Sequence, residues 1–210
     1  MGKKKAARPL VYNNPARFAC QDDRNVLVDK VALGLDLGTN CGYAYSIIRP
    51  DGTWDFQPWY MGLWDLSTGR YDSGNLGFLR LRCFLTRVCP DIVFMEEVRY
   101  TPAEAVNRYN AARIVARAAT SAELLGAFKQ TVSLWCNDHD VHCAGIPIGT
   151  IKKRATGRGN ANKTQMIEAC NEEFQTNFDV EGYETTGVDN IADAAWVLRC
   201  GLEEYGDGRL

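Results

Sequence analysis

No run of apolar residues in this 210-residue sequence approaches the length of about 18 that a membrane-spanning helix needs. No positively charged segment followed by an apolar one opens the chain as a secretory signal would. Its start, MGKKKA, has Ala6 where a myristoylation signal requires serine or threonine. We therefore expect a cytoplasmic protein with no membrane partner.

Paired cysteine motifs are also missing, because the eight cysteines include no C-x-x-C pair. Apolar residues make up 46% of the chain, which is enough for one well-packed domain without covalent cross-links. The cysteines are most simply reduced and buried, as is usual in the cytosol.

Charge is present but unevenly distributed. Residues 99–163 carry ten lysines and arginines against four acids, whereas residues 164–210 carry two against eleven. The net charge of −2 therefore hides a basic middle and an acidic tail. A basic segment that faces a phosphate backbone, with acids collected elsewhere for metal, is one interpretation. Ordinary solvated helix faces are the other, and charge alone does not decide between them.

The order of apolar and turn segments predicts a single α/β domain. Residues 1–29 contain two prolines and no clear period, which predicts a flexible basic arm before a domain at 30–210. We expect strands at 31–37, 42–48, 59–66, 91–98 and 141–149, and helices at 74–89, 101–138, 160–174 and 190–205. An antiparallel meander followed by alternating helices and strands predicts a mixed five-stranded sheet with helices on both faces.

One carboxylate, Asp36, interrupts the apolar segment VALGLDLGTNCGYAYS near the end of the first strand. Glu96 and Glu97 end the segment DIVFMEEV, where the alternation of strand side chains lets only one of them face inward. Asp189 and Asp193 are four residues apart and share one face of the last helix. Neighbouring parallel strands would place Asp36 beside one glutamate, with the helix adding its two acids. Such a cluster could hold a pair of Mg²⁺ ions for phosphodiester hydrolysis.

Two of these acids also have ordinary structural explanations. Asp36 could accept hydrogen bonds from the backbone of the turn at 38–40, a common role for an aspartate at a strand end. Asp189 could be the N-cap of the last helix. Asp193 is harder to explain in this way, since it lies among apolar residues on a helix that we expect to be largely buried.

The segment TIKKRATGRGNANK, residues 150–163, concentrates five positive charges: Lys152, Lys153, Arg154, Arg158 and Lys163. Two glycines loosen its backbone, and an asparagine at 160 or 162 can cap the helix that follows. A glycine loop that leads into a helix N-terminus can bind phosphate, and lysines add charge. This favours a DNA-binding segment over an exposed loop that is merely solvated.

The motif GLDLGTN, residues 34–40, is similar to sequences in two families. It resembles the phosphate loop of the actin-like and sugar-kinase ATPases, and also the first strand of the RNase H-like nucleases. The ATPases close two such lobes around a nucleotide, whereas this chain has the length of one lobe and no second DxGG-type loop. A nuclease is the better interpretation, and an ATPase lobe is the alternative.

Four segments together narrow the resemblance: LGLDLGTNCGYAYS, DIVFMEEV, IPIGTIKKRATGRGNANKTQMIEA and DNIADAAWVL. They resemble the RuvC family of Holliday junction resolvases, especially its phage-encoded branch, over residues 31 to about 202. The resemblance implies an RNase H-like fold and a homodimer that cuts two strands of a four-way DNA junction with Mg²⁺ or Mn²⁺. For a phage-encoded protein it implies action in the cytoplasm of the bacterial host.

The resemblance also implies roles for individual residues. Asp36 matches the acid that bridges the two metal ions, Glu96 the second ligand and Asp193 the acid of the last helix. The fourth family acid stands three residues before the last one, where this chain has Asn190, so Asp189 is the expected substitute. Lys152 and Lys163 stand at positions where members of the family have lysines that contact DNA near the scissile phosphate.

Two further features concern the junction and the dimer. Bacterial members place a stacking phenylalanine three residues after the glutamate, whereas this chain has Arg99 there, with Tyr100 beside it. Both are candidate DNA contacts, and the departure puts strict selectivity for four-way junctions in question. The alanine-rich helix predicted at 101–138 is the candidate dimer interface, because small residues let helices approach closely; packing on the sheet would explain the alanines equally well.

We therefore expect a metal-dependent endonuclease that resolves four-way junctions. A nuclease with broader activity on branched or flap DNA is one alternative, and a junction-binding protein without catalytic activity is another.

Overall fold

The computed structural model describes residues 29–55, 60–69, 72–97 and 111–206, with only the backbone described at 55 and 111–121. The strands are β1 (Lys30–Asp36), β2 (Asn40–Ile48), β3 (Trp54–Asp55), β4 (Met61–Asp65), β5 (Ile92–Glu97) and β6 (His142–Pro147). The helices are α1 (Leu76–Val88), α2 (Ala111–Asp138), α3 (Ile148–Thr156), α4 (Lys163–Phe174), α5 (Tyr183–Thr186) and α6 (Val188–Gly206).

The six strands occupy five positions in one mixed sheet. Strands β3 and β4 pair with successive stretches of the same edge of β2, and the order continues through β1 and β5 to β6. Strand β2 is antiparallel to its neighbours, whereas β1, β5 and β6 run parallel. The predicted meander followed by parallel strands is confirmed.

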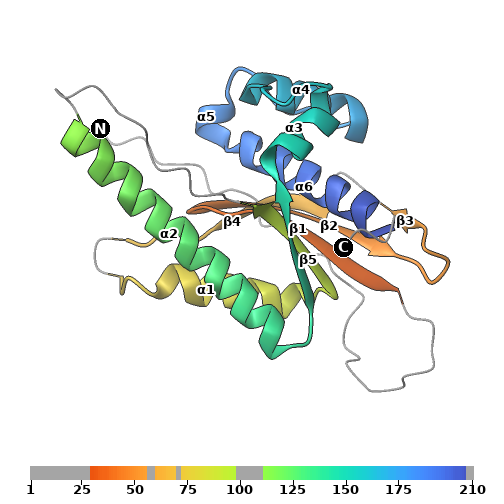
Figure 1. Ribbon diagram of the computed structural model, residues 1–210, viewed down its shortest axis with the longest axis horizontal. Helices are drawn as coiled ribbons and strands as arrows, with labels where there is room; N and C mark the ends of the chain where they lie inside the picture. The colour runs from red at the N-terminus through yellow and green to blue at the C-terminus, as the bar shows by residue number, and fades with distance from the viewer. Residues whose placement is uncertain (1–28, 56–59, 70–71, 98–110, 207–210) are drawn as a thin grey trace, which may run out of the picture.

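Helices cover both faces of this sheet (Figure 1). On one face, α1 and α2 enclose apolar side chains that include Leu33 and Leu35 of β1. On the other, α6 lies across the sheet with α3 and α4 outside it, and their core includes Ala32 of β1 and Phe94 of β5. Because strand side chains alternate, Asp36 points to the α6 face together with Ala32.

Close packing of α6 depends on glycines, which leave room for its backbone. A Cβ atom built on Gly34 of β1 would lie 2.7 Å from the carbonyl oxygen of Ala194. One built on Gly42 of β2 would lie 1.8 Å from the carbonyl oxygen of Asn190. These two strand positions therefore allow α6 to rest directly on β1 and β2.

We expect Gly34→Ala to destabilise the protein, because the added methyl group meets backbone atoms of α6 that cannot move independently. The loss in unfolding free energy should be about 1–3 kcal/mol, the usual range for overpacking. The matched control is Gly149→Ala in α3, where a Cβ atom meets nothing within 4 Å. That change should be neutral or stabilising. Urea unfolding measures both, and equal stability of the two variants would contradict the packing argument.

The structure differs from the predicted elements at the basic segment. Residues 148–156 form α3 directly after β6, where the sequence suggested a strand end and a glycine loop. Ile151 is buried in the core beneath this helix, and the helix ends at Gly157, whose φ of 75° suits glycine. The first ten residues of the helix predicted at 101–138 lie outside the described residues.

Two expectations from composition can be compared with the described part of the chain. Its cysteines form no disulfide, and Cys41, Cys136, Cys170 and Cys200 are buried, but Cys83 is exposed. The expectation that all cysteines are buried is therefore wrong. None of the described helices combines the length and the hydropathy needed to cross a membrane.

Candidate active site

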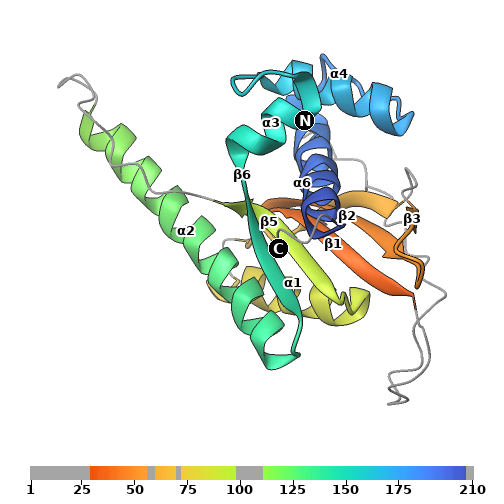
Figure 2. The ribbon, with the colours of Figure 1, turned by 45° about the vertical axis from the view of Figure 1, so that its right-hand side comes forward.

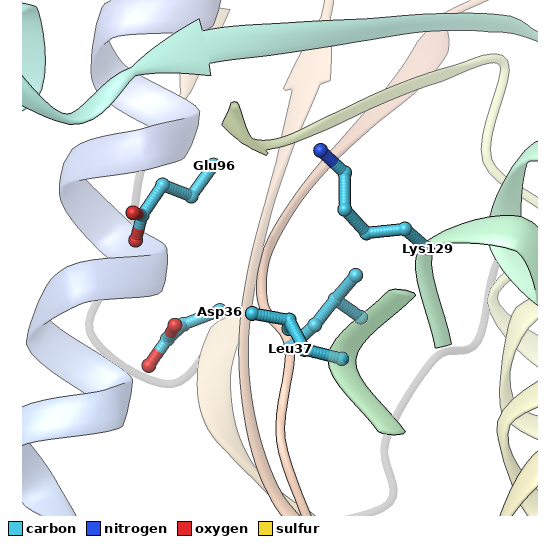
Figure 3. Close-up of a pocket in the computed structure, with 5 residues that line it drawn as sticks. Asp36, Leu37, Glu96 and Lys129 are labelled. Carbon is cyan, nitrogen blue, oxygen red and sulfur yellow. The ribbon is translucent and has the colours of Figure 1, made fainter. Parts of the chain in front are cut away.

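Asp36 and Glu96 lie side by side at the carboxyl ends of β1 and β5. The parallel register pairs Leu35 with Met95, so the next position on each strand is one of these two acids. Their carboxylates point to the same side, toward α6 (Figure 3). Glu97 takes the alternate direction, where its Cβ lies 3.3 Å from the position of a Cβ on Gly145. The strand alternation therefore selects Glu96 for this site.

Helix α6 brings the other two acids to the same edge. It begins at Val188, so Asp189 lies in its first turn and is not its N-cap. Asn190 donates a hydrogen bond of 2.9 Å from its side chain to the carbonyl oxygen of Asn40. This bond ties the start of α6 to β2 and leaves Asp189 and Asp193 on the face toward Asp36.

The four acids interact electrostatically. Burial raises the pKa of Asp36 well above its usual value, and three negative charges raise it further: those of Asp193, Glu96 and Asp189. Burial likewise raises the pKa of Asp193 to about 6, with Asp189 and Glu96 adding to the effect. Among the described residues, none donates a hydrogen bond to Asp36. The alternative in which this acid caps the turn at 38–40 therefore has no support.

Lys163 is the cation in direct contact with this cluster. Its amine pairs with the carboxylate of Asp189, whose side chain is only 9% exposed, while the lysine itself is 56% exposed. The lysine amine also lies 5.8 Å from the centre of the Tyr183 ring. Lys163 is the first residue of α4, which Asn162 caps through a reciprocal bond with Gln165. Of the two asparagines proposed as caps, Asn162 is the one used.

The rest of the basic segment divides into two groups. Lys152 on α3 is half-buried. Its positive charge lowers the pKa of both Glu96 and Asp193, although burial of these two acids raises their pKa by more. Lys153 and Arg158 are exposed to solvent.

Arg154, by contrast, makes a two-pronged ion pair with Glu203 of α6, with nitrogen–oxygen distances of 2.9 Å. Its guanidinium also lies 5.9 Å from the centre of the Trp196 ring. This side chain holds α3 against α6, which is not the open phosphate contact that the sequence suggested. Arg99 and Tyr100 lie outside the described residues.

The donor set fits hard divalent cations. Among the described residues, no group of three or more carboxylate, imidazole or thiol side chains lies close enough together to hold a metal ion. Mg²⁺ does not require one, since it keeps several waters and binds through one or two carboxylates. Within the described residues, the carboxylates of Asp36, Glu96 and Asp193 repel one another and form no ion pair, so one or two of them are available as ligands. Positive charge placed between them would relieve the repulsion.

Sequence reasoning missed one cation at this edge. Lys129 of α2 lines a pocket together with Asp36, Glu96, Leu37 and Leu125, and approaches it from the side opposite α6 (Figure 3). The long helix was predicted, but nothing in its spacing indicated which turn would face the acids.

Comparison with known proteins identifies solved structures that have a similar fold. No family model matches the sequence, and no curated protein is significantly similar to it. Among solved structures, Thermus thermophilus RuvC superposes with a TM-score of 0.58 at 15% identity, over 85% of this chain and 97% of that one. The same protein in complex with a Holliday junction substrate gives 0.56 at 13% identity, over the same shares.

The yeast mitochondrial Holliday junction resolvase Ydc2 gives a TM-score of 0.51 at 14% identity, over 85% of this chain and 82% of that one. The mixed sheet, the helices on its two faces and these superpositions agree with one another. The structural resemblance is thus confirmed at the level of architecture: this chain has the RNase H-like fold of the RuvC resolvases.

Proposed function

We propose that this protein is a divalent-metal-dependent DNA endonuclease that resolves four-way junctions. The observation that carries the proposal is the cluster of four acids from β1, β5 and α6, flanked by Lys152 and Lys163. Perturbed carboxylates gathered at one edge, with cations around them, are typical of phosphoryl-transfer sites. The fold shared with the RuvC resolvases supports the same activity.

Asp36, Glu96 and Asp193 would hold two Mg²⁺ or Mn²⁺ ions, with Asp189 as the fourth acid. Bound ions of this kind activate a water molecule and stabilise the leaving oxygen of an in-line displacement. Asp189 also orients the Lys163 amine, which would bind a non-bridging oxygen of the scissile phosphate. Lys152 would neutralise charge on the same phosphate from α3.

The partner would be branched DNA. A structure of Thermus thermophilus RuvC contains a Holliday junction substrate, which supports this choice. Exposed Lys153 and Arg158 would add phosphate contacts beside Lys152 and Lys163, and Arg99 and Tyr100 remain candidate contacts at the junction. Binding through these cations should weaken steeply with salt, because each phosphate contact releases counterions.

Two active sites are needed to cut two strands, so we propose a homodimer. Helix α2 runs well beyond the edge of the sheet and leaves the body of the domain (Figure 2). Its described outer face carries Gly126, Gln130 and Leu134, the last 48% exposed. A second copy packed along α2 would cover this face.

The test compares purified protein on four-way, flap, fork and linear DNA duplexes, each with Mg²⁺ and with EDTA. We expect paired nicks in the four-way junction that require the metal ion. Equal cutting of flaps and forks would instead indicate a broader branched-DNA nuclease, and junction binding without nicks would indicate a non-catalytic protein. Thermal stabilisation by ATP, without cleavage, would support an ATPase lobe and contradict the proposal.

A further inference from the structure

The pocket beside the acids has a basic wall that the proposed mechanism does not use. Lys129 and Leu125 come from α2, and Leu37 from the end of β1. They face Asp36 and Glu96 across the pocket, with the lysine on the opposite side from α6 (Figure 3). Since α3, α4 and α6 lie on the other face of the sheet, this wall is separate from the one that carries Lys152 and Lys163 (Figure 1).

The contacts of Lys129 give no structural reason for a lysine at this position. It is half-buried, and no ion pair joins it to another residue in the described part of the chain. Burial raises the pKa of Glu96, and the nearby charge of Lys129 lowers it by a smaller amount. The same charge also lowers the pKa of Cys143. A cation beside carboxylates that does not pair with them is available to an anion that arrives from outside.

We propose that Lys129 binds a backbone phosphate of the cleaved DNA strand, so that this strand runs between α2 on one side and α3 and α4 on the other. The inference rests on the proposed function and adds the path of the strand. The neighbouring Leu37 and Leu125 would lie against a sugar or base, while the amine contacts the phosphate next to the scissile one. A point-charge contact of this type fixes the position of the strand without reading its sequence.

The test measures binding of a synthetic four-way DNA junction in EDTA over a series of KCl concentrations. We expect Lys129→Met to weaken binding about three- to tenfold at moderate salt and to reduce the slope of log Kd against log salt by about 1, since one phosphate contact is lost. Lys129→Arg, which keeps the charge, should restore the slope. Methionine retains the aliphatic stem, and thermal unfolding checks that the variant is folded.

The matched control is Lys30→Met, which removes an exposed lysine at the opposite end of β1 and should leave the slope unchanged. An unchanged slope in Lys129→Met, in a protein whose wild type binds and cuts the junction, would overturn this inference and leave the proposed function intact. A slower cut with unchanged binding would also overturn it, because Lys129 would then act only through Glu96. Wild-type protein that neither binds nor cuts the junction would overturn both.

Discussion

Replacing Asp36 by asparagine should abolish junction cleavage while leaving junction binding intact or tighter. The charges of Glu96, Asp189 and Asp193 all raise the pKa of Asp36, so this carboxylate faces the other three acids and would be a central ligand of the bound ions. The loss should exceed the roughly 10²–10³-fold effect of deleting one preorganised hydrogen-bond donor from an active site. Binding should not suffer, because the substitution removes a negative charge that faces the phosphate backbone.

The matched control for this experiment is Asp140→Asn. Asp140 is exposed in the turn between α2 and β6, and its φ of 54° is one that asparagine adopts readily. The control should cut at the wild-type rate. Single-turnover cleavage and binding in EDTA, measured for both variants, separate chemistry from affinity. Parental cleavage by Asp36→Asn would show that the acids do not form the active site.

The same cluster should make the metal-free protein less stable at neutral pH than in mild acid. Folding raises the pKa of Asp193 from 3.8 to about 6 and raises those of Asp36 and Glu96. The folded state therefore holds protons that the unfolded state has already released. Stability from these groups is present in full below about pH 4 and is lost as the pH rises through 6. Asp193 alone accounts for about 3 kcal/mol, at 1.36 kcal/mol per pKa unit.

Urea unfolding in EDTA at pH 4.5 and pH 7 measures this loss in wild-type protein and in Asp193→Asn. Other carboxylates titrate in the same range, so the difference between the two proteins isolates the contribution of Asp193. The variant should lose less stability over this interval and be the more stable protein at pH 7. If both proteins depend on pH in the same way, Asp193 does not lie in the repulsive cluster that the structure describes.

Mg²⁺ or Mn²⁺ should restore the stability at pH 7, since the ions bind the folded protein and relieve the repulsion. At a hundredfold excess over Kd the gain is about 2.7 kcal/mol, or roughly 5–10 °C in Tm for a domain of this size. The gain should shrink at pH 4.5, where protons compete for the carboxylates, and in Asp36→Asn. This readout is independent of cleavage.

Much of the acid cluster was predictable because it depends on local rules. Parallel strands end at a common edge, so an aspartate that ends β1 and a glutamate that ends β5 had to be neighbours once the strand order was known. Alternation allowed only one of Glu96 and Glu97 to face the site. The family resemblance favoured Glu96, and the strand register places this residue beside Asp36. Helical spacing placed Asp189 and Asp193 on one face of α6, although the N-cap alternative for Asp189 could be excluded only when the helix start was known.

The basic side of the site was less predictable. Five positive charges in one segment suggested a common role, but α3 directs Arg154 to Glu203 while Lys152 lies near the acids. The helix itself was missed because its lysines, together with the two glycines that follow it, resembled a phosphate-binding loop. Its formation depends on Ile151, which gains stability only by burial in a core built from distant segments.

The sequence alone determined most of the order of strands and helices and the grouping of four candidate acids near one another, because these follow from side-chain periodicity and chain order. The tertiary structure alone decided how closely α6 approaches the sheet, over Gly34 and Gly42, and which lysines reach the acids. It also placed Lys129 across the pocket from them. These features depend on packing between segments far apart in the chain, where the fit of side chains and backbone, rather than any local pattern, fixes the distances.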